Sequence, residues 1–287
     1  MRYAVLGAAG QLGRDLCPRL PDEVIPLTRE QIDLTRPETV RAVLEDLRPE
    51  VVINCAAYNF VDRAESEPEA AFAVNAWGAR ALALACHDLG CTLVHFSTDY
   101  VFGLDETRDV PYAENDAPGP VSVYGLSKLA GEYQVRSNCP RHFVIRTCGL
   151  YGVWGSGGKG GNFVETMLRL ATQGKPLRVV ADQICTPSYT VDVASATAAL
   201  IATSRYGLYH LTNGGGCSWC DFARTIFETA GLSVDLTAIP SREYPTTARR
   251  PPYSVLAAKA YHALGLPAIR PWFEAVPAYL QERRQKN

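Results

Sequence analysis

The sequence predicts an α/β protein built on a doubly wound parallel sheet, and three observations carry that prediction. Short apolar runs alternate with amphipathic stretches through the first half of the chain, which is the pattern of repeated β-α-β units. A glycine-rich turn directly follows the first apolar run, as the tight turn between a parallel strand and its helix requires. The chain of 287 residues is 47% hydrophobic and 20% charged, which is an ordinary globular composition.

The same composition limits the partners of the protein. The 28 basic and 30 acidic side chains nearly cancel, so no basic surface is expected to hold nucleic acid. No apolar run reaches the roughly 18 to 20 residues that cross a bilayer, and the first residues lack the layout of a secretory signal. We therefore expect a cytoplasmic protein whose nine cysteines are reduced, and we interpret Cys217-Ser-Trp-Cys220 as chance spacing.

Apolar periodicity sets the elements of the first half. Helices are expected where apolar residues recur three or four positions apart, and strands where the apolar run is short and continuous. The run at 51–55 has the unbroken apolar character of a strand buried on both faces. In chain order we expect strands at 2–6, 24–27, 51–55, 92–97 and 142–146, separated by helices at 11–20, 37–47, 69–89 and 122–135.

After about residue 150 the alternation loosens. A glycine-rich loop is expected at 152–161, and a loop with three prolines at 241–252. Two short helices are expected to close the chain. Between these segments the sequence favours helices at 162–172, 190–202 and 218–230 and strands at 177–180 and 207–211.

Gly7, Gly10 and Gly13 are spaced three apart between the first strand and the first helix. Such a turn lets backbone N–H groups approach a pyrophosphate, and the helix N-terminus adds partial positive charge. A tight turn without a ligand could show the same pattern, but its position in a β-α-β unit favours a dinucleotide-binding Rossmann fold. We expect that domain at 1–150, and at 151–287 a smaller, mainly substrate-binding lobe that returns some elements to the main sheet.

The end of the second predicted strand bears on the choice of dinucleotide. An acidic side chain there would hold the ribose 2′-hydroxyl and repel a 2′-phosphate. This chain has Thr28-Arg29 instead, and a guanidinium can pair with a phosphate. The sequence thus favours NADP(H), unless Arg29 is only a solvated charge, and places Asp33 near the adenine.

Tyr124 and Lys128 lie one helical turn apart in the predicted helix 122–135. A phenol, with an ordinary pKa of about 10, exchanges protons poorly near neutral pH. An adjacent ammonium and a positive nicotinamide ring would lower that pKa toward the operating pH. Lysine can also hydrogen-bond ribose hydroxyls, so we predict that the pair is catalytic rather than a chance spacing on a surface helix.

Ser97, Thr98 and Asp99 follow at the carboxyl end of the predicted strand 92–97, where ligands collect in open α/β sheets. The Thr98 hydroxyl can bind a substrate oxygen and orient the proton of the tyrosine. Asp99 can hold sugar hydroxyls. Capping of a turn is the alternative role for Thr98 and Asp99.

Together these residues resemble the extended short-chain dehydrogenase/reductase family, and within it the branch of dTDP-4-dehydrorhamnose reductases. The two most specific stretches are Ser-Thr-Asp-Tyr-Val-Phe at 97–102 and Val-Asp-Arg-Ala-Glu-Ser-Glu at 61–67. The other stretches that carry the resemblance, which spans nearly the whole chain, are 7–13, 54–58, 74–75, 111–114, 124–132, 146–147, 161–163, 244–246 and 250–251.

The resemblance implies reduction of dTDP-4-dehydro-β-L-rhamnose to dTDP-L-rhamnose by hydride transfer from NADPH, or alternatively from NADH. Tyr124 would protonate the carbonyl oxygen, Lys128 would bind the nicotinamide ribose, and Thr98 and Asp99 would bind substrate. Asn162 and Arg250 would approach the diphosphate of the nucleotide sugar. The cofactor-binding set would be Gly7, Gly10, Gln11, Leu12, Gly13, Arg29, Asp33, Leu34, Ala56, Ala57, Tyr58, Asn75, Tyr124 and Lys128.

Two features of the chain depart from some members of that family. Where those members carry a tryptophan that packs on the sugar, this chain has Gly149, and Trp154 is the candidate replacement. Some members also bind magnesium through acidic residues at a dimer interface. Asp15 matches one such position in type, but the full set is missing, so we predict no metal and leave a homodimer open.

Two other functions remain open at this level. A nucleotide-sugar epimerase or dehydratase would share the fold, but dehydratases usually have Asp-Glu after the threonine, and here Tyr100 follows Asp99. A non-catalytic regulatory subunit of the methionine adenosyltransferase type would keep the cofactor fold as a binding partner. The intact Thr98, Tyr124 and Lys128 disfavour that reading.

Overall fold

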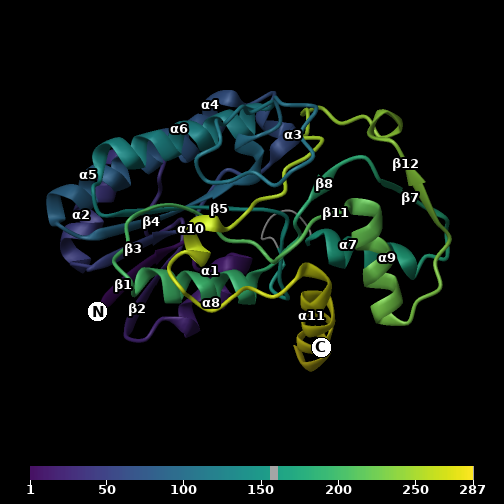
Figure 1. The fold of residues 1–287 in the computed structure, drawn as a ribbon. Helices are drawn as coiled ribbons and strands as arrows, with labels where there is room; N and C mark the ends of the chain where they lie inside the picture. Colours follow the sequence, from purple (N-terminus) through teal and green to yellow (C-terminus); the bar gives the residue numbers. More distant parts are fainter. Residues whose placement is uncertain (156–160, 287) are drawn as a thin grey trace.

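A computed structural model describes residues 1–155 and 161–286 (Figure 1). Its centre is a six-stranded sheet in which every neighbouring pair is parallel. The strand order reverses between β1 and β3, which is the point where ligands bind in folds of this kind. From one edge to the other the strands are β2 (Glu23–Leu27), β1 (Arg2–Leu6), β3 (Val51–Asn54), β4 (Thr92–Thr98), β5 (His142–Thr147) and β10 (Gly207–His210).

Helices cover both faces of this sheet, because its strands carry apolar side chains on both sides (Figure 1). Val5 and Ile53 belong to one buried cluster, and their neighbours Leu6 and Val52 belong to the other. The first face is covered by α1 (Gln11–Leu16), α8 (Thr190–Ile201) and α10 (Lys259–His262), and the second by α2 (Pro37–Leu47), α5 (Ala79–Leu89) and α6 (Val123–Asn138). The predicted doubly wound fold is confirmed.

Two predicted helices of the first half are interrupted. The one expected at 11–20 ends early as α1 and continues as a 3₁₀ turn, Cys17–Arg19, because Pro18 has no N–H for a helical bond. The one expected at 69–89 is divided into α4 (Pro68–Phe72), a π-helical turn η2 (Ala73–Gly78) and α5. Short elements that we did not predict are α3 (Val61–Ala64) and η3 (Asp99–Val101).

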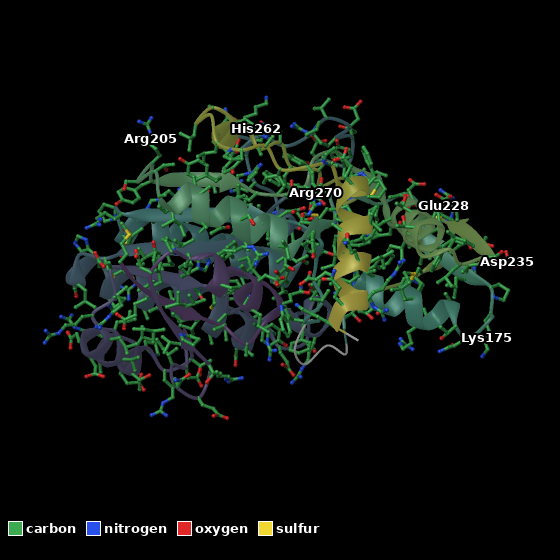
Figure 2. The ribbon with its side chains drawn as sticks, turned by 90° about the horizontal axis from the view of Figure 1, so that it is seen from below. Lys175, Arg205, Glu228, Asp235, His262 and Arg270 are labelled. Carbon is green, nitrogen blue, oxygen red and sulfur yellow. The ribbon has the colours of Figure 1, made fainter. Side chains whose placement is uncertain are left out.

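The second half builds a third hydrophobic cluster beside the sheet, around α7 (Phe163–Ala171), α9 (Trp219–Ala230) and α11 (Trp272–Lys286). Figure 1 shows these helices grouped at one end of the molecule, and Lys175, Glu228 and Asp235 lie at its outer margin in Figure 2. The last helix, α11, has 15 residues, so the prediction of two short closing helices was wrong for it. Small strand pairs complete this region: β6 (Leu150–Tyr151) with β9 (Ser188–Tyr189), β7 (Leu177–Val180) with β12 (Leu236–Ile239), and β8 (Ile184–Cys185) with β11 (Cys217–Ser218).

The two halves share the main sheet. β10 pairs with β5, and α8 packs against α1, although both elements come after residue 150. All nine cysteines lie in the described part of the chain and are free thiols. Within residues 1–155 and 161–286, no helix has the length and hydropathy needed to cross a membrane.

Candidate active site

A cleft of about 1080 Å³ lies at the carboxyl ends of the strands, where the strand order reverses. That volume lies just above the roughly 300–1000 Å³ usual for one small ligand, so the cleft can take a dinucleotide and a second molecule. Its walls come from both halves of the chain. The predicted site residues that line it are Gly7, Gly10, Gln11, Leu12, Gly13, Arg29, Asp33, Leu34, Ala56, Ala57, Tyr58, Thr98, Asp99, Tyr124, Lys128 and Asn162.

The glycine turn forms one end of this cleft. A Cβ atom on Gly13 would lie 2.5 Å from the carbonyl oxygen of Gly7, so a larger residue there would force the turn apart. Gly10 precedes α1, and no side chain in the described ranges caps this helix end. The first N–H groups of α1 therefore remain available to an anionic ligand.

Arg29 and Asp33 lie at the outer margin of the same end. The Arg29 side chain is 80% exposed, and its Nε is 3.6 Å from Asp33 Oδ2. Asp33 accepts bonds from the backbone N–H and the hydroxyl of Thr35, and the backbone bond is the main reason that its pKa is lowered. The carboxylate is thus fixed by its own turn, whereas the guanidinium is free to move toward a phosphate.

Tyr124 is placed by the first turn of α6. The Ser122 hydroxyl accepts the N–H of Gly125 at 3.1 Å and caps the helix. A Cβ atom on Gly125 would lie 2.2 Å from the carbonyl oxygen of Tyr100, so only glycine lets the helix approach η3 this closely. The rings of Tyr124 and Tyr100 then meet edge to face, with centroids 5.7 Å apart. Thr98 and Tyr124, from two separate elements, are brought together.

The protein itself holds Tyr124 in its protonated form. Burial raises the pKa of Tyr124 to about 12, and a hydrogen bond with the Thr98 side chain opposes that rise. Lys128, which we expected to lower this pKa, is not among the causes of the shift. Its ammonium donates to the carbonyl oxygen of Phe96 at 2.6 Å. Within the protein, the contact that lowers the Tyr124 pKa is therefore the hydrogen bond with Thr98.

Lys128 is itself buried. Desolvation lowers the pKa of Lys128 to about 8, and the negative charge of Glu132 works against that lowering. Near neutral pH the side chain is still largely an ammonium. It can therefore hydrogen-bond ribose hydroxyls and stabilise a phenolate nearby.

The Asp99 carboxylate is held by two hydroxyl groups. Its Oδ1 accepts from Thr98 at 3.1 Å and its Oδ2 from Ser254 at 2.6 Å, and burial raises its pKa. Thr98 also accepts the N–H of Tyr100 at 3.2 Å and so caps η3. The same hydroxyl therefore both caps this turn and lies beside Tyr124. Ser254 was missed from the sequence, because no local motif indicates a contact with a residue 155 positions away.

Two predicted binding residues lie outside the cleft lining in the described part of the chain. Asn75 bonds the backbone N–H and carbonyl of Tyr58, both at 2.9 Å, and also the Ser127 hydroxyl. It therefore supports the cleft wall from behind. Arg250 makes a two-pronged ion pair with Asp62, at 2.7 and 3.1 Å, which fixes the chain near 250 to α3.

Trp154, the candidate for the missing tryptophan, is not among the described residues that line the cleft. Its indole N–H donates to Asp15 at 3.0 Å, and the Lys286 ammonium lies 3.6 Å from its ring centroid. Asp15 also accepts from Thr190 at 2.5 Å. The indole is thus held between Asp15 on α1 and Lys286 on α11.

A different tryptophan faces the cleft beside Gly149. Trp219, at the start of α9, has a ring atom 3.5 Å from where a Cβ of Gly149 would stand. Its ring centroid lies 4.8 Å from that of Phe163, at the start of α7, which also lines the cleft. The signal for Trp219 was present in Cys217-Ser-Trp-Cys220, which we considered only for its cysteine spacing.

The parallel sheet, the glycine turn and the meeting of Thr98, Tyr124 and Lys128 define a Rossmann-type reductase of the short-chain dehydrogenase/reductase class. The chain belongs to the family described as "RmlD substrate binding domain", whose model matches residues 1–285. The resemblance drawn from the sequence is confirmed at the level of the family.

Named relatives agree with this assignment. The spore coat polysaccharide biosynthesis protein SpsK of Bacillus subtilis (strain 168) is 42% identical, over 98% of this chain and 98% of that protein. The dTDP-4-dehydrorhamnose reductase of Sinorhizobium fredii is also 42% identical, over 89% of this chain and 88% of that protein. The solved structure of dTDP-4-dehydrorhamnose reductase from Bacillus anthracis in complex with NADP has a TM-score of 0.92 at 38% identity, covering 98% of this chain and 99% of that one.

Proposed function

We propose that this protein reduces the 4-keto group of dTDP-4-dehydro-β-L-rhamnose with NADPH to give dTDP-L-rhamnose. The observation that carries the proposal is that Thr98, Tyr124 and Lys128 line one cleft, which is large enough for a dinucleotide and a sugar nucleotide, with Thr98 and Lys128 buried in its wall. The choice of substrate is supported by relatives of about 40% identity that are named dTDP-4-dehydrorhamnose reductase. The choice of cofactor is supported by the Bacillus anthracis structure, which was solved in complex with NADP.

The residues of the cleft fit a nicotinamide dinucleotide. The Gly7–Gly13 turn is tight, because a Cβ on Gly7 or Gly13 would collide with neighbouring backbone, and the uncapped start of α1 would face the pyrophosphate. Asp33 and Leu34 would meet the adenine, Arg29 the 2′-phosphate, and 56–58 the middle of the cofactor. When bound, NADPH supplies the hydride to the carbonyl carbon.

The chain supplies the proton. Because its pKa is raised, Tyr124 carries the proton that it must give to the carbonyl oxygen. Thr98 orients that hydroxyl, and the Lys128 ammonium favours the phenolate left behind. A positioned proton donor of this kind contributes about 10²–10⁴-fold to a rate.

The substrate would occupy the part of the cleft shared with the second half of the chain. Asp99 would accept a bond from a sugar hydroxyl, and Trp219 with Phe163 would cover the apolar face of the 6-deoxy ring. Asn162 caps α7 through Glu165 N–H at 3.0 Å and donates to Gly152 O at 2.8 Å. We therefore assign it to orienting the start of α7 toward the diphosphate, with Arg250 on the other side.

Two alternatives share the fold. A UDP-glucose 4-epimerase from Thermus thermophilus in complex with NAD has a TM-score of 0.81 at 24% identity, which is likeness of fold alone. A non-catalytic binding subunit would have no need of the catalytic trio at the cleft. Since both substrates of the proposed reaction are small soluble molecules, we also infer that the protein works in the cytoplasm.

The test is to mix the purified protein with NADPH or NADH and a panel of 4-keto and 4-hydroxy nucleotide sugars, and to follow the absorbance of the reduced nicotinamide. We expect oxidation with dTDP-4-dehydro-L-rhamnose, and faster oxidation of NADPH than of NADH. Interconversion of 4-hydroxy epimers without net oxidation would favour the epimerase. Tight cofactor binding with no turnover of any sugar would favour the binding subunit.

A further inference from the structure

A buried ion pair lies behind the catalytic residues. Glu132 is fully buried and the Arg146 side chain is 2% exposed. The guanidinium donates two bonds to the carboxylate, at 2.8 and 2.7 Å, and the Ser97 hydroxyl donates a third at 2.5 Å. Arg146 also lies over the Phe102 ring, 5.0 Å from its centroid. Burying two charges is costly even when they are paired, and Nη1 of Arg146 is buried without a hydrogen-bond partner among the described residues, so the pair calls for an explanation.

The pair joins β5 to the two elements that carry the catalytic groups, α6 and β4. Glu132 lies on α6, one helical turn after Lys128 and two after Tyr124. Ser97 lies on β4 between Phe96, whose carbonyl accepts from Lys128, and Thr98, which bonds Tyr124. Arg146 lies on β5 beside Ser97 in the strand register. The carboxylate therefore holds α6 against the ends of β4 and β5. The spacing between Tyr124 on α6 and Thr98 on β4 depends on this packing.

The same carboxylate sets the charge around Lys128. Three titratable groups interact electrostatically with this ammonium: Glu132 on α6, Cys55 after β3 and His95 on β4. Burial raises the pKa of the Cys55 thiol and lowers that of His95, so both are neutral near pH 7. Of the three, Glu132 alone brings a negative charge, and Arg146 offsets part of it.

We propose that Glu132 is a positioning residue of this active site, which holds α6 against β4 and β5 and keeps Lys128 in its ammonium form. Burial alone would drive the lysine toward its neutral state, in which it could no longer stabilise a phenolate. The buried pair thus serves the site and not only the fold. The kinetic consequence rests on the proposed function, but the charge on Lys128 can be followed without turnover.

The experiment measures the affinity for NADP⁺ by quenching of tryptophan fluorescence, at pH values below and above the Lys128 pKa of about 8. In the wild type the affinity should fall as pH rises through that value, because the ammonium is lost. In Glu132→Gln the midpoint of the fall should move down by about one pH unit, which is a tenfold change in proton affinity. In Arg146→Met, which removes the opposing positive charge, the midpoint should move up.

A purely structural pair would give a different pattern. Both substitutions would then weaken binding at all pH values and leave the midpoint unchanged, and that result would overturn the proposal. Because the two substitutions are expected to shift the midpoint in opposite directions, either variant alone tests the proposal if the other fails to fold. Ser97→Ala keeps both charges, so it should lower kcat several-fold with the midpoint unchanged; an unchanged kcat would remove the positioning part of the claim.

The matched control is Asp192→Asn. It breaks another two-pronged pair, from Arg270 to Asp192 at 2.8 and 2.7 Å, which joins α8 to the start of α11 near Arg270 in Figure 2. Asp192 does not line the cleft among the described residues, so the midpoint should stay in place. If wild-type protein binds NADP⁺ with the expected midpoint but reduces no ketone, the proposed function fails while the assignment of Glu132 stands.

Discussion

The two ends of the cleft hold charge in opposite ways. At the catalytic end, Glu132 and Arg146 are 0% and 2% exposed and share two short bonds. At the adenine end, Arg29 and Asp33 are 80% and 27% exposed and lie 3.6 Å apart. Water screens the second pair and leaves the first almost unscreened. We therefore expect the catalytic groups to be held by the buried pair, and the preference between cofactors to depend on the exposed Arg29.

The largest effect should come from removing the proton that the catalytic end delivers. Tyr124→Phe keeps the ring and its contact with Tyr100, so NADP⁺ affinity should be close to that of the wild type. We expect kcat to fall by about 10²–10⁴-fold, measured by NADPH oxidation with the keto sugar. Tyr133→Phe, an exposed tyrosine on the same helix, is the control and should change nothing; a Tyr124→Phe enzyme with near-normal kcat would refute the role of this hydroxyl.

Unfolding in denaturant compares the two charge pairs directly. Arg146→Met leaves the Glu132 carboxylate buried without its counter-charge, and the free energy of unfolding should fall by about 3–5 kcal/mol. Arg29→Met breaks an exposed pair and should cost less than about 1 kcal/mol. Equal losses in the two variants would show that burial does not distinguish these pairs.

A smaller effect is expected where the sugar binds. Trp219→Leu keeps apolar bulk at the start of α9 but loses the flat ring, so KM for the nucleotide sugar should rise by about tenfold. The KM for NADPH should be unaffected. Trp154→Leu should leave the KM of both substrates unchanged, and a larger effect there than at Trp219 would restore Trp154 as the residue that faces the sugar.

The smallest effect should be at the adenine end. Arg29→Ala removes one exposed cation near the expected 2′-phosphate, and its interaction in water amounts to about 0.3–1 kcal/mol. The ratio of kcat/KM for NADPH to that for NADH should therefore be only a few-fold lower in this variant than in the wild type. A ratio that does not change would mean that Arg29 is only a solvated charge.

The first half of the chain was predictable because its signals are local. The Gly7–Gly13 turn, the unbroken apolar run of β3 and the Tyr124–Lys128 spacing each lie within one or two elements, so the parallel sheet followed from them, whereas most residues of the cofactor side were implied by the family resemblance. The errors there were breaks inside helices. Pro18 ended α1, and the π-helical turn η2 divided the long helix where Asn75 turns back to bond Tyr58.

The second half was less predictable because distant segments assemble it. The bond from Ser254 to Asp99 spans 155 positions, and the ion pair from Arg250 to Asp62 spans 188. Strands of two residues, such as β6 and β9, are too short to show a period. Trp154 and Trp219 could be told apart only by packing, since one is held by Asp15 and Lys286 and the other faces the cleft.

The central claim is that Tyr124 protonates the ketone oxygen while hydride reaches the adjacent carbon. A crystal structure of the complex with NADP⁺ and dTDP-L-rhamnose tests it most directly. We predict that the Tyr124 hydroxyl lies within hydrogen-bond distance of the sugar O4, with the nicotinamide ring against C4 and the Lys128 ammonium on the ribose. A sugar whose O4 meets another side chain, with Tyr124 remote from the nicotinamide, would contradict the account.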